Sequence, residues 1–380
     1  MSFDISSKAF AGRVRRFIQS ASDAFPGRPV GVSGSAFEDL AIELFSLQFE
    51  QNSAYRRICE ARGVSPRILA HWDQIPAVPA AAFKELELSC LPPEERTRVF
   101  YSSGTTEQRP SRHFHNAASL ALYEASLWPW FAGHLGAGEG VSAPHLFLLT
   151  PPPEAAPHSS LVHMFEFIRR QPVWGESALL GRVAPDDSWM LNLDAAVACL
   201  KRTVAARSPA VLLGTAFSFV HLLDFLAEHE LRLELPPGSR VLETGGYKGR
   251  SRSLPRAELH HLITSRLGVP PSQIVCEYGM SELSSQAYAR VAVTSPQAED
   301  VRSPAAFHFP PWARAQLISP ETGREVAEGE TGLIRVFDLA NAYSVMAIQT
   351  EDLGVRRGAG FELVGRAAQA EARGCSLMAR

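Results

Sequence analysis

The sequence predicts an α/β protein in which a mainly parallel sheet, flanked by helices, is joined to a small antiparallel β subdomain. In the middle of the chain, short apolar runs alternate with helical patterns, and this alternation is typical of parallel sheets. Near the C-terminus, short strand-like runs are separated by turn residues such as Glu321-Thr-Gly323. The chain has 380 residues, of which 46% are hydrophobic, so a large core can form.

The N-terminal third is predicted to be helical. Ser35, with Glu38 three residues later, forms a capping box that opens a helix of roughly four turns. A stretch rich in proline then leads to a short apolar run that ends at Tyr101, and a polar loop follows.

The middle of the chain carries the predicted parallel strands. They are expected at His145–Leu149, Val211–Leu213, Val241–Leu242 and Ile274–Val275, and the helices at Ala195–Ala206, Phe217–Ala227 and Arg256–Leu267. Asp194 is expected to cap the first of these helices, and Pro255 suits the entry of the third. Ligands of such sheets bind at the carboxyl ends of the strands.

The antiparallel strands are predicted at Ala315–Ile318, Gly332–Asp338 and Phe361–Val364. We expect three regions: a helical region over residues 1–97 packed on the large domain, an α/β core over 98–310, and a β-rich subdomain over 311–380.

Charge and composition exclude several classes of partner. The formal net charge of −3 provides no global field that would attract nucleic acid or an acidic membrane. The N-terminus lacks a basic segment followed by an apolar one, so no secretory signal is expected. The longest apolar run, Val211 to Leu223, is shorter than the ~18 residues of a membrane span.

The cysteine pattern argues against both disulfides and a structural zinc site. The five cysteines are odd in number and form no CxxC pair: Cys59, Cys90, Cys199, Cys276 and Cys375. We therefore expect free thiols in a reducing cytoplasm, where one of them is available as a nucleophile.

The first chemical motif is the loop Ser102-Ser103-Gly104-Thr105-Thr106. Hydroxyls around a glycine offer side-chain and backbone donors to phosphate oxygens. The alternative is a solvated Ser/Thr turn. The chain contains no GxxxxGK[ST] motif, so this is not a P-loop.

The second and third motifs follow predicted strands. Gly245 and Gly246 permit a flat ligand to approach the backbone closely. The run Glu277-Tyr278-Gly279-Met280-Ser281-Glu282 offers an aromatic face, a hydroxyl and carboxylates, and we expect it to bind a nucleotide. Tyr278 is placed to stack on a base and Glu282 to bind Mg²⁺. Alternatively, Glu282 is simply an acid at a helix N-terminus.

Two further candidates lie near the C-terminus. Asp352, expected in a turn, can accept two hydrogen bonds from a ribose diol, or it is a simple Asp turn. Arg366 can neutralise phosphate or carboxylate charge. Arg373 would favour the thiolate form of Cys375, although a lone cysteine is more often an inert buried residue.

The order of these motifs resembles the adenylate-forming superfamily of acyl and aryl ligases. The strings SSGTTEQRPSRH, ETGGYKGR, EYGMSELSSQAY and RGCSL are similar to one branch, the acyl-protein synthetase (LuxE-type) family, which is related to phenylacetate–CoA ligases. The match spans roughly residues 98 to 380, and several motifs in a fixed order are far more specific than any one alone.

The resemblance implies a role for each candidate. Ser102 to Thr106 would bind phosphate, and Glu282 would bind Mg²⁺. Gly245 and Gly246 would line the adenine and acyl pocket, and Tyr278 would stack on adenine. Asp352 would hold the ribose, Arg366 would contact the nucleotide, and Cys375 would accept the acyl group. The phosphate loop lacks the family's basic residue, so Arg109 or Arg112 would serve. The chain is expected to lack the small C-terminal domain of full-length ligases, and a partner subunit would then complete the site.

The resemblance thus implies an enzyme that uses ATP and Mg²⁺ to convert a fatty or aryl acid to acyl-AMP. The acyl group would then pass to a thiol of Cys375, a carrier protein, a partner enzyme or CoA. One alternative is an acyltransferase that moves an acyl group from acyl-CoA to a carrier protein without ATP. The other is a non-catalytic nucleotide-binding subunit, against which the joint presence of Glu282, Asp352 and Arg366 argues.

Overall fold

The computed structural model describes residues 3–23, 34–102, 109–136, 143–245, 254–290 and 306–367. Among these residues, six strands form the central sheet in the order β11-β10-β9-β8-β4-β5. Their bounds are β4 His145–Leu148, β5 Ser177–Leu179, β8 Ala210–Thr215, β9 Arg240–Thr244, β10 Ile274–Tyr278 and β11 Ala287–Arg290. All neighbours pair in parallel except β10 and β11.

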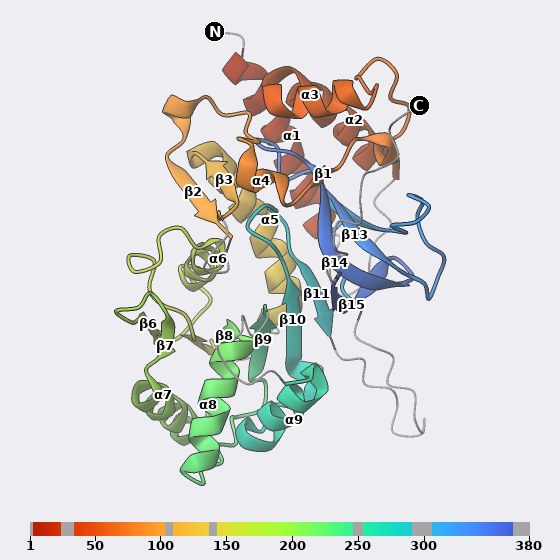
Figure 1. Ribbon diagram of the computed structural model, residues 1–380. Helices are drawn as coiled ribbons and strands as arrows, with labels where there is room; N and C mark the ends of the chain where they lie inside the picture. The colour runs from red at the N-terminus through yellow and green to blue at the C-terminus, as the bar shows by residue number, and fades with distance from the viewer. Residues whose placement is uncertain are drawn as a thin grey trace.

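Helices cover both faces of the central sheet (Figure 1). They are α5 Ala117–Leu135 and α6 Ser160–Arg169 on one face, and α7 Leu193–Ala206, α8 Ala216–Glu228 and α9 Arg256–Leu267 on the other. Successive strand residues point to opposite faces, so Val241 packs in the core of α7, α8 and α9, whereas Leu242 packs in the core of α5 and α6. Burial on both faces explains why these strands read as continuous apolar runs.

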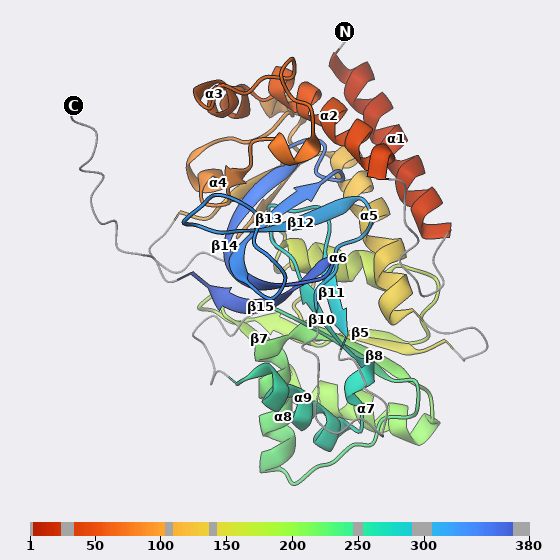
Figure 2. The ribbon, with the colours of Figure 1, turned by 90° about the vertical axis from the view of Figure 1, so that its right-hand side faces the viewer.

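A second sheet has the order β1-β14-β13-β12, and β15 also pairs with β14. Its strands are β1 Val78–Pro79, β12 Ala313–Ile318, β13 Thr331–Asp338, β14 Ala347–Arg357 and β15 Gly360–Arg366. Only β1 is parallel to its neighbour, and the other pairs are antiparallel. Figure 2 shows this blue sheet between the N-terminal helices and the central sheet.

The N-terminal helices are bonded to this second sheet. They are α1 Phe3–Asp23, α2 Gly34–Gln51 and α3 Ser53–Ala61, followed by the short α4 Ala82–Glu85. The side chain of Gln48 donates to the carbonyl of Asn341 (2.9 Å) and accepts from the amide of Met346 (3.0 Å). In β1, Val78 pairs with Ile348 of β14. The predicted regional boundaries near residues 97 and 310 stay a prediction.

Two small two-stranded sheets complete the architecture. One pairs β2 Arg98–Tyr101 with β3 Arg112–His115, and the other pairs β6 Gly181–Val183 with β7 Trp189–Leu191. Short 3₁₀ turns lie at Trp72–Gln74, Pro93–Glu95 and Pro271–Gln273. None of the helices in the described ranges is long and apolar enough to cross a membrane. Cys59, Cys90, Cys199 and Cys276 are all buried free thiols.

The mixed α/β fold with a mainly parallel sheet and an antiparallel subdomain is confirmed, but three local predictions are wrong. Ser35 does not cap α2, because this helix already begins at Gly34 and the Glu38 carboxylate accepts from the amide of Trp72 (2.9 Å). Asn192, not Asp194, caps α7, because its side chain accepts a hydrogen bond from the amide of Ala195 (3.2 Å). Asp352 lies inside strand β14 rather than in a turn. The sequence around Asp352 is polar and therefore did not predict a strand. Its extended conformation is stabilised by pairing with β13 and β15.

The carboxylate of Asp338, at the end of β13, joins the two sheets. It is fully buried and accepts hydrogen bonds from the amide of Ser284 (2.8 Å), the hydroxyl of Ser285 (2.7 Å) and the amide of Ala340 (3.0 Å). Ser284 and Ser285 belong to the segment between β10 and β11. This acid therefore fixes that segment of the central sheet against the second sheet.

Replacing Asp338 by Ala should lower the free energy of unfolding by about 2–4 kcal/mol, because three buried donors would lose their acceptor. Urea unfolding followed by circular dichroism measures the loss. The exposed Asp73, replaced in the same way, serves as the matched control and should change the stability by less than about 0.5 kcal/mol. Equal effects of the two substitutions would contradict the role given to Asp338.

Candidate functional site

The carboxyl ends of β8, β9 and β10 lie side by side, since these strands are parallel and adjacent. They end at Thr215, Thr244 and Tyr278, and Gly245 follows β9 with a φ of +70°. That backbone angle favours glycine, which explains the residue type at the exit of the strand. The predicted motifs of β9 and β10 thus meet at one edge of the sheet.

The hairpin of β2 and β3 closes just before the predicted phosphate loop. The amide of Ser111 donates to the hydroxyl of Ser102 (3.0 Å), and the amide of Ser102 donates to the carbonyl of Ser111 (3.3 Å). Ser103, Gly104, Thr105 and Thr106 lie outside the described residues. Ser102 and Ser111, on the two sides of this segment, are therefore held together by two hydrogen bonds.

This hairpin contacts the segment that follows β10. The hydroxyl of Ser281 donates to the carbonyl of Tyr101 (3.2 Å), and Nδ1 of His113 lies 2.7 Å from the carbonyl of Ser281. Since a carbonyl can only accept, Nδ1 of His113 carries the proton. Burial lowers the pKa of His113 to about 4, so the ring is neutral at physiological pH. The end of β2, from which the predicted phosphate loop starts, thereby lies next to the predicted nucleotide segment.

The main chain of Glu282 is held by Asn341. Its carbonyl accepts from the side-chain amide of Asn341 (2.8 Å), and the residue is only 5% exposed. Burial raises the pKa of the Glu282 carboxyl, while the Ser111 hydroxyl and the charges of Arg366 and Lys84 act in the opposite direction. Glu282 is therefore an acid near a hydroxyl and two cations, and it does not begin a helix.

Tyr278, Asp352 and Arg366 form a connected group. The hydroxyl of Tyr278 donates to Oδ2 of Asp352 (2.9 Å), and Nε of Arg366 lies 3.4 Å from Oδ1 of the same carboxylate. Asp352 and Arg366 are also paired across β14 and β15. The side chain of Asp352 is 16% exposed and that of Arg366 is 78% exposed, so the arginine is the solvent-facing end of the group.

A bulge in β15 sets the position of Arg366. Leu353 pairs with Gly365 and Gly354 pairs with Leu363, so one residue of β15 is left over. Gly365 has a φ of +151°, a value that residues with side chains rarely adopt. Such bulges redirect the side chains next to them. Here the bulge directly precedes the arginine that faces Asp352.

Glu277 is buried at the same edge of the sheet. It accepts a hydrogen bond from the hydroxyl of Thr244 across the pair of β9 and β10. Burial raises the pKa of Glu277 to about 7, with the charge of Glu243 adding to the effect and the Thr244 bond opposing it. A Cβ at Gly279 would collide with the Glu277 carboxylate, so a larger residue there would require the Glu277 side chain to shift. Met280 packs against the core and lies 4.0 Å from the Tyr278 hydroxyl.

The described site therefore brings together Ser102, Gly245, Glu277, Tyr278, Gly279, Met280, Ser281, Glu282, Asp352 and Arg366, all predicted from the sequence. Gly246 and Cys375 lie outside the described residues, and their roles stay predictions, as does base stacking on Tyr278. Sequence reasoning assigned no role to Thr244 or His113. Both lie inside the quoted motif strings, so the motifs themselves carried the signal.

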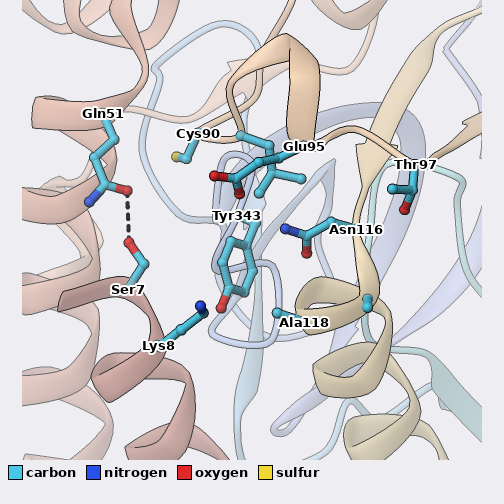
Figure 3. A pocket seen from close by; sticks show the side chains of 11 residues that line it. Ser7, Lys8, Gln51, Cys90, Glu95, Thr97, Asn116, Ala118 and Tyr343 are labelled. Carbon is cyan, nitrogen blue, oxygen red and sulfur yellow. Dashed lines mark hydrogen bonds between the residues drawn. The ribbon is translucent and has the colours of Figure 1, made fainter. Parts of the chain in front are cut away.

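A cavity of about 340 Å³ lies elsewhere, where α1 approaches the start of α5. Figure 3 shows Lys8 directed toward the hydroxyl of Tyr343, with Cys90 and Asn116 on the other walls. None of the predicted site residues lines it. The cavity is therefore separate from the strand edge described above.

Comparison with known proteins bears on this arrangement. A sequence profile of the family described as "Acyl-protein synthetase, LuxE" matches residues 184–380, which is more than half of the chain. The chain belongs to this family. The LuxE family assignment confirms the resemblance read from the motifs and the expectation of an enzyme of the acyl-protein synthetase type.

Two relatives of this LuxE family member carry the same name, long-chain-fatty-acid–luciferin-component ligase. The protein from Aliivibrio fischeri is 24% identical over 356 residues, covering 90% of this chain and 86% of its own. The protein from Vibrio harveyi is 22% identical over 349 residues, covering 88% and 84%.

Solved structures of 2-hydroxyisobutyryl-CoA ligase share the fold of this LuxE family member. An open conformation in complex with 2-HIB-AMP and CoA has a TM-score of 0.61 at 13% identity, covering 91% of this chain and 75% of its own. The postadenylation state in complex with 2-HIB-AMP has a TM-score of 0.59 at 16% identity, covering 88% and 69%. The expected adenylate-forming fold is thus confirmed.

Changing Glu277 to Gln should remove a pH dependence of stability. The folded-state pKa of about 7 lies above the ordinary 4.5, so protonation stabilises the fold at low pH and this gain is lost as the pH rises through 7. Between pH 5 and pH 8, wild-type protein should lose about 2–3 kcal/mol more unfolding free energy than the variant.

Urea unfolding at the two pH values checks this expectation. The exposed Glu60, changed to Gln, is the control, and that variant should follow the wild-type pH profile. A Glu277→Gln profile parallel to wild type would show that this carboxyl does not titrate in that window.

Proposed function

We propose that this chain activates a carboxylic acid with ATP, forming acyl-AMP and pyrophosphate, and then transfers the acyl group to a thiol. The observation that carries the proposal is the meeting of distant motifs at one strand edge. The Tyr278 hydroxyl bonds to Asp352, 74 residues away, and Ser281 bonds to the hairpin strand that leads to Ser102. Strand ends of this kind are where α/β sheets bind ligands.

The residues present fit a nucleotide. Asp352 uses one lone pair of Oδ2 for Tyr278, and a carboxylate has about four acceptor positions, so acceptor sites are left for ribose hydroxyls. Arg366 is exposed beside it and can meet phosphate or carboxylate charge. The bridge of Ser102 and Ser111 holds the two sides of the predicted phosphate loop at a fixed separation. The 2-hydroxyisobutyryl-CoA ligase structure in complex with 2-HIB-AMP supports the same assignment on a shared fold.

The residues also fit Mg²⁺. Glu282 offers a buried carboxylate beside the Ser111 hydroxyl, and Mg²⁺ favours one or two carboxylates together with phosphate oxygens. When bound, the ion would neutralise phosphate charge. The protein's own part is to orient Glu282 through Asn341 and to hold the acid and nucleotide in line.

The two chemical steps balance. An oxygen of the substrate carboxylate bonds to the α-phosphorus of ATP, and the bond to pyrophosphate breaks. A thiolate then bonds to the acyl carbon, and the bond to AMP breaks, which leaves a thioester. In both steps the protein contributes mainly by positioning the reactants and neutralising charge.

The names of the relatives favour a long-chain fatty acid as the substrate. We propose that class for this chain, with aryl acids as the competing outcome. The acceptor is proposed to be Cys375, from which the acyl group passes to a partner enzyme, a carrier protein or CoA.

Acid-dependent exchange of labelled pyrophosphate into ATP tests the function directly. The assay runs with Mg²⁺ over a panel of long-chain fatty acids, short acids and aryl acids. Exchange with the long-chain acids is the expected result. No exchange with any acid would sink the adenylation step, and thioester formation from labelled acyl-CoA without ATP would point to an acyltransferase.

Glu282→Gln should slow this exchange by about 10²-fold or more, because a positioned charge at the phosphates is lost. The exposed Glu228 at the end of α8, changed to Gln, is the control and should exchange at the wild-type rate. Unchanged exchange in the Glu282 variant, with normal folding by circular dichroism, would refute its role.

Cys375→Ser should leave pyrophosphate exchange intact but abolish a hydroxylamine-sensitive acyl-enzyme, since the hydroxyl is a much poorer nucleophile than a thiolate. Labelled fatty acid with ATP, followed by gel separation, reads out the acyl-enzyme. Cys199→Ser provides a buried-cysteine control that should still be labelled. A labelled thioester in the Cys375 variant would assign the acceptor to another group.

A further inference from the structure

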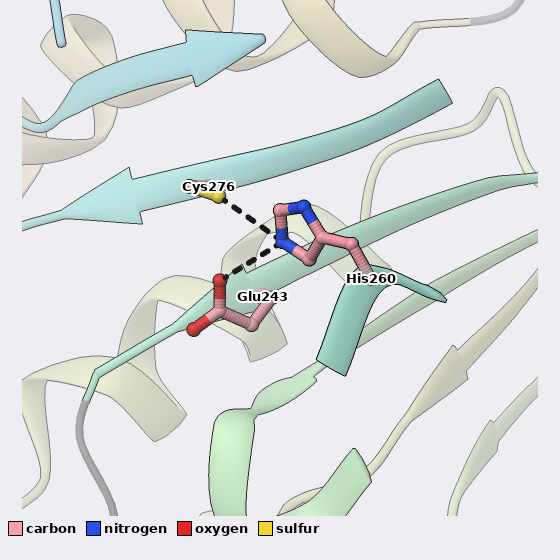
Figure 4. A group of neighbouring side chains, drawn as sticks. All are labelled: Glu243, His260 and Cys276. Atoms are coloured by element: carbon pink, nitrogen blue, oxygen red, sulfur yellow. Dashed lines mark hydrogen bonds and ion pairs between the residues drawn. The ribbon is translucent and has the colours of Figure 1, made fainter. Parts of the chain in front are cut away.

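Three side chains that can bind a metal ion converge on the face of the central sheet that α9 covers. Glu243 of β9 and Cys276 of β10 are Cα partners across the strand pair, so they point to the same face. His260 of α9 reaches down between them (Figure 4). Thr244 and Glu277, one residue further along, belong to the opposite face, and the three residues of the cluster have no role in the nucleotide site proposed above.

The spacing of the three donor atoms matches a metal site. Nε2 of His260 lies 3.6 Å from Sγ of Cys276 and 3.7 Å from Oε2 of Glu243, and the donor atoms all lie within 4.8 Å of one another. Tetrahedral zinc, with bonds of about 2.3 Å to sulfur and about 2.0 Å to nitrogen or oxygen, separates S from N by about 3.5 Å and N from O by about 3.3 Å. The observed separations are within a few tenths of an ångström of these edges.

The cluster is also incompletely satisfied without a cation. Glu243 is 8% exposed, His260 6% and Cys276 2%. Oε2 of Glu243 is buried and has no hydrogen-bond partner within the described residues, since 3.7 Å to His260 is too long. Among those residues no lysine or arginine forms an ion pair with Glu243. An isolated buried carboxylate is costly, and a bound cation would remove that cost.

The geometry does not suit a nucleophilic triad. In such a triad the histidine uses one ring nitrogen for the nucleophile and the other for the orienting acid. Here the thiol and the carboxylate both face Nε2 of His260. A single nitrogen aimed between a sulfur and an oxygen is the arrangement of a ligand set around a common centre.

We propose that Glu243, His260 and Cys276 bind a divalent transition-metal ion of the zinc class. Mixed sulfur, nitrogen and oxygen donors suit zinc, whereas magnesium and calcium favour oxygen alone. The donors come from two strands and a helix, which is why the cysteine spacing in the sequence contains no zinc motif. The bound ion would fasten α9 to the ends of β9 and β10.

Metal loading of the full chain tests this site with zinc and cobalt alone as probes, in the absence of ATP and acid. After chelation and dialysis, zinc should bind at one equivalent per chain. Cobalt should give the thiolate-to-cobalt charge-transfer absorption that marks a cysteine ligand. Absence of both would overturn the site.

Variants locate the ion. Cys276→Ala should abolish the charge-transfer absorption, whereas Cys199→Ala, another buried cysteine, should keep it. His260→Ala should weaken zinc binding by at least about 100-fold, whereas its exposed neighbour His261→Ala should bind normally. Persistence of the absorption in the Cys276 variant would place the ion elsewhere and overturn the assignment.

X-ray absorption spectroscopy of zinc-loaded wild-type protein gives a test that does not depend on the folding of any variant. One sulfur neighbour at about 2.3 Å together with nitrogen and oxygen neighbours at about 2.0 Å is expected. A spectrum without sulfur, or with two or more sulfur neighbours, would overturn the proposed ligand set.

Discussion

The buried carboxylate of Asp338 holds the second sheet to the segment that carries Glu282. The hydrogen bonds that it accepts from Ser284 and Ser285 join the end of β13 to the segment between β10 and β11, beside the bond from Asn341 to the Glu282 carbonyl. Because Ser281 is held by the β2–β3 hairpin, Glu282 is fixed between two anchored neighbours. The position of its main chain is therefore set by hydrogen bonds within the protein.

The sequence predicts four of the five parallel strands of the central sheet, β4, β8, β9 and β10 but not β5, for a physical reason. Strands buried on both faces appear as apolar runs, and the residues that follow them, such as Gly245 and Tyr278, must lie at one edge. Strand β14 escapes prediction because its residues around Asp352 are polar, and their extended conformation depends on pairing with strands on both sides. Local propensity carries no information about such partners.

Side-chain interactions between neighbouring strands could not be predicted from the sequence either. The bond from Thr244 to Glu277 and the cluster of Glu243, His260 and Cys276 both depend on the register of β9 against β10. A shift of one residue in that register would move each side chain to the other face. Strands β9 and β10 thus carry Glu243 and Glu277 on opposite faces, one register step apart.

The pairing of β1 with β14 has a consequence for how the chain is made. Val78 and Ile348 are 270 residues apart, and Trp72 packs edge-on against Phe337 of β13. At roughly 5–20 residues per second, a ribosome needs about 15 to 50 seconds to supply these partners after the N-terminal helices have emerged. Throughout that interval β1 lacks its strand partner, and Gln48 of α2 lacks its partners Asn341 and Met346, so this part of the fold is completed only after β14 has been made.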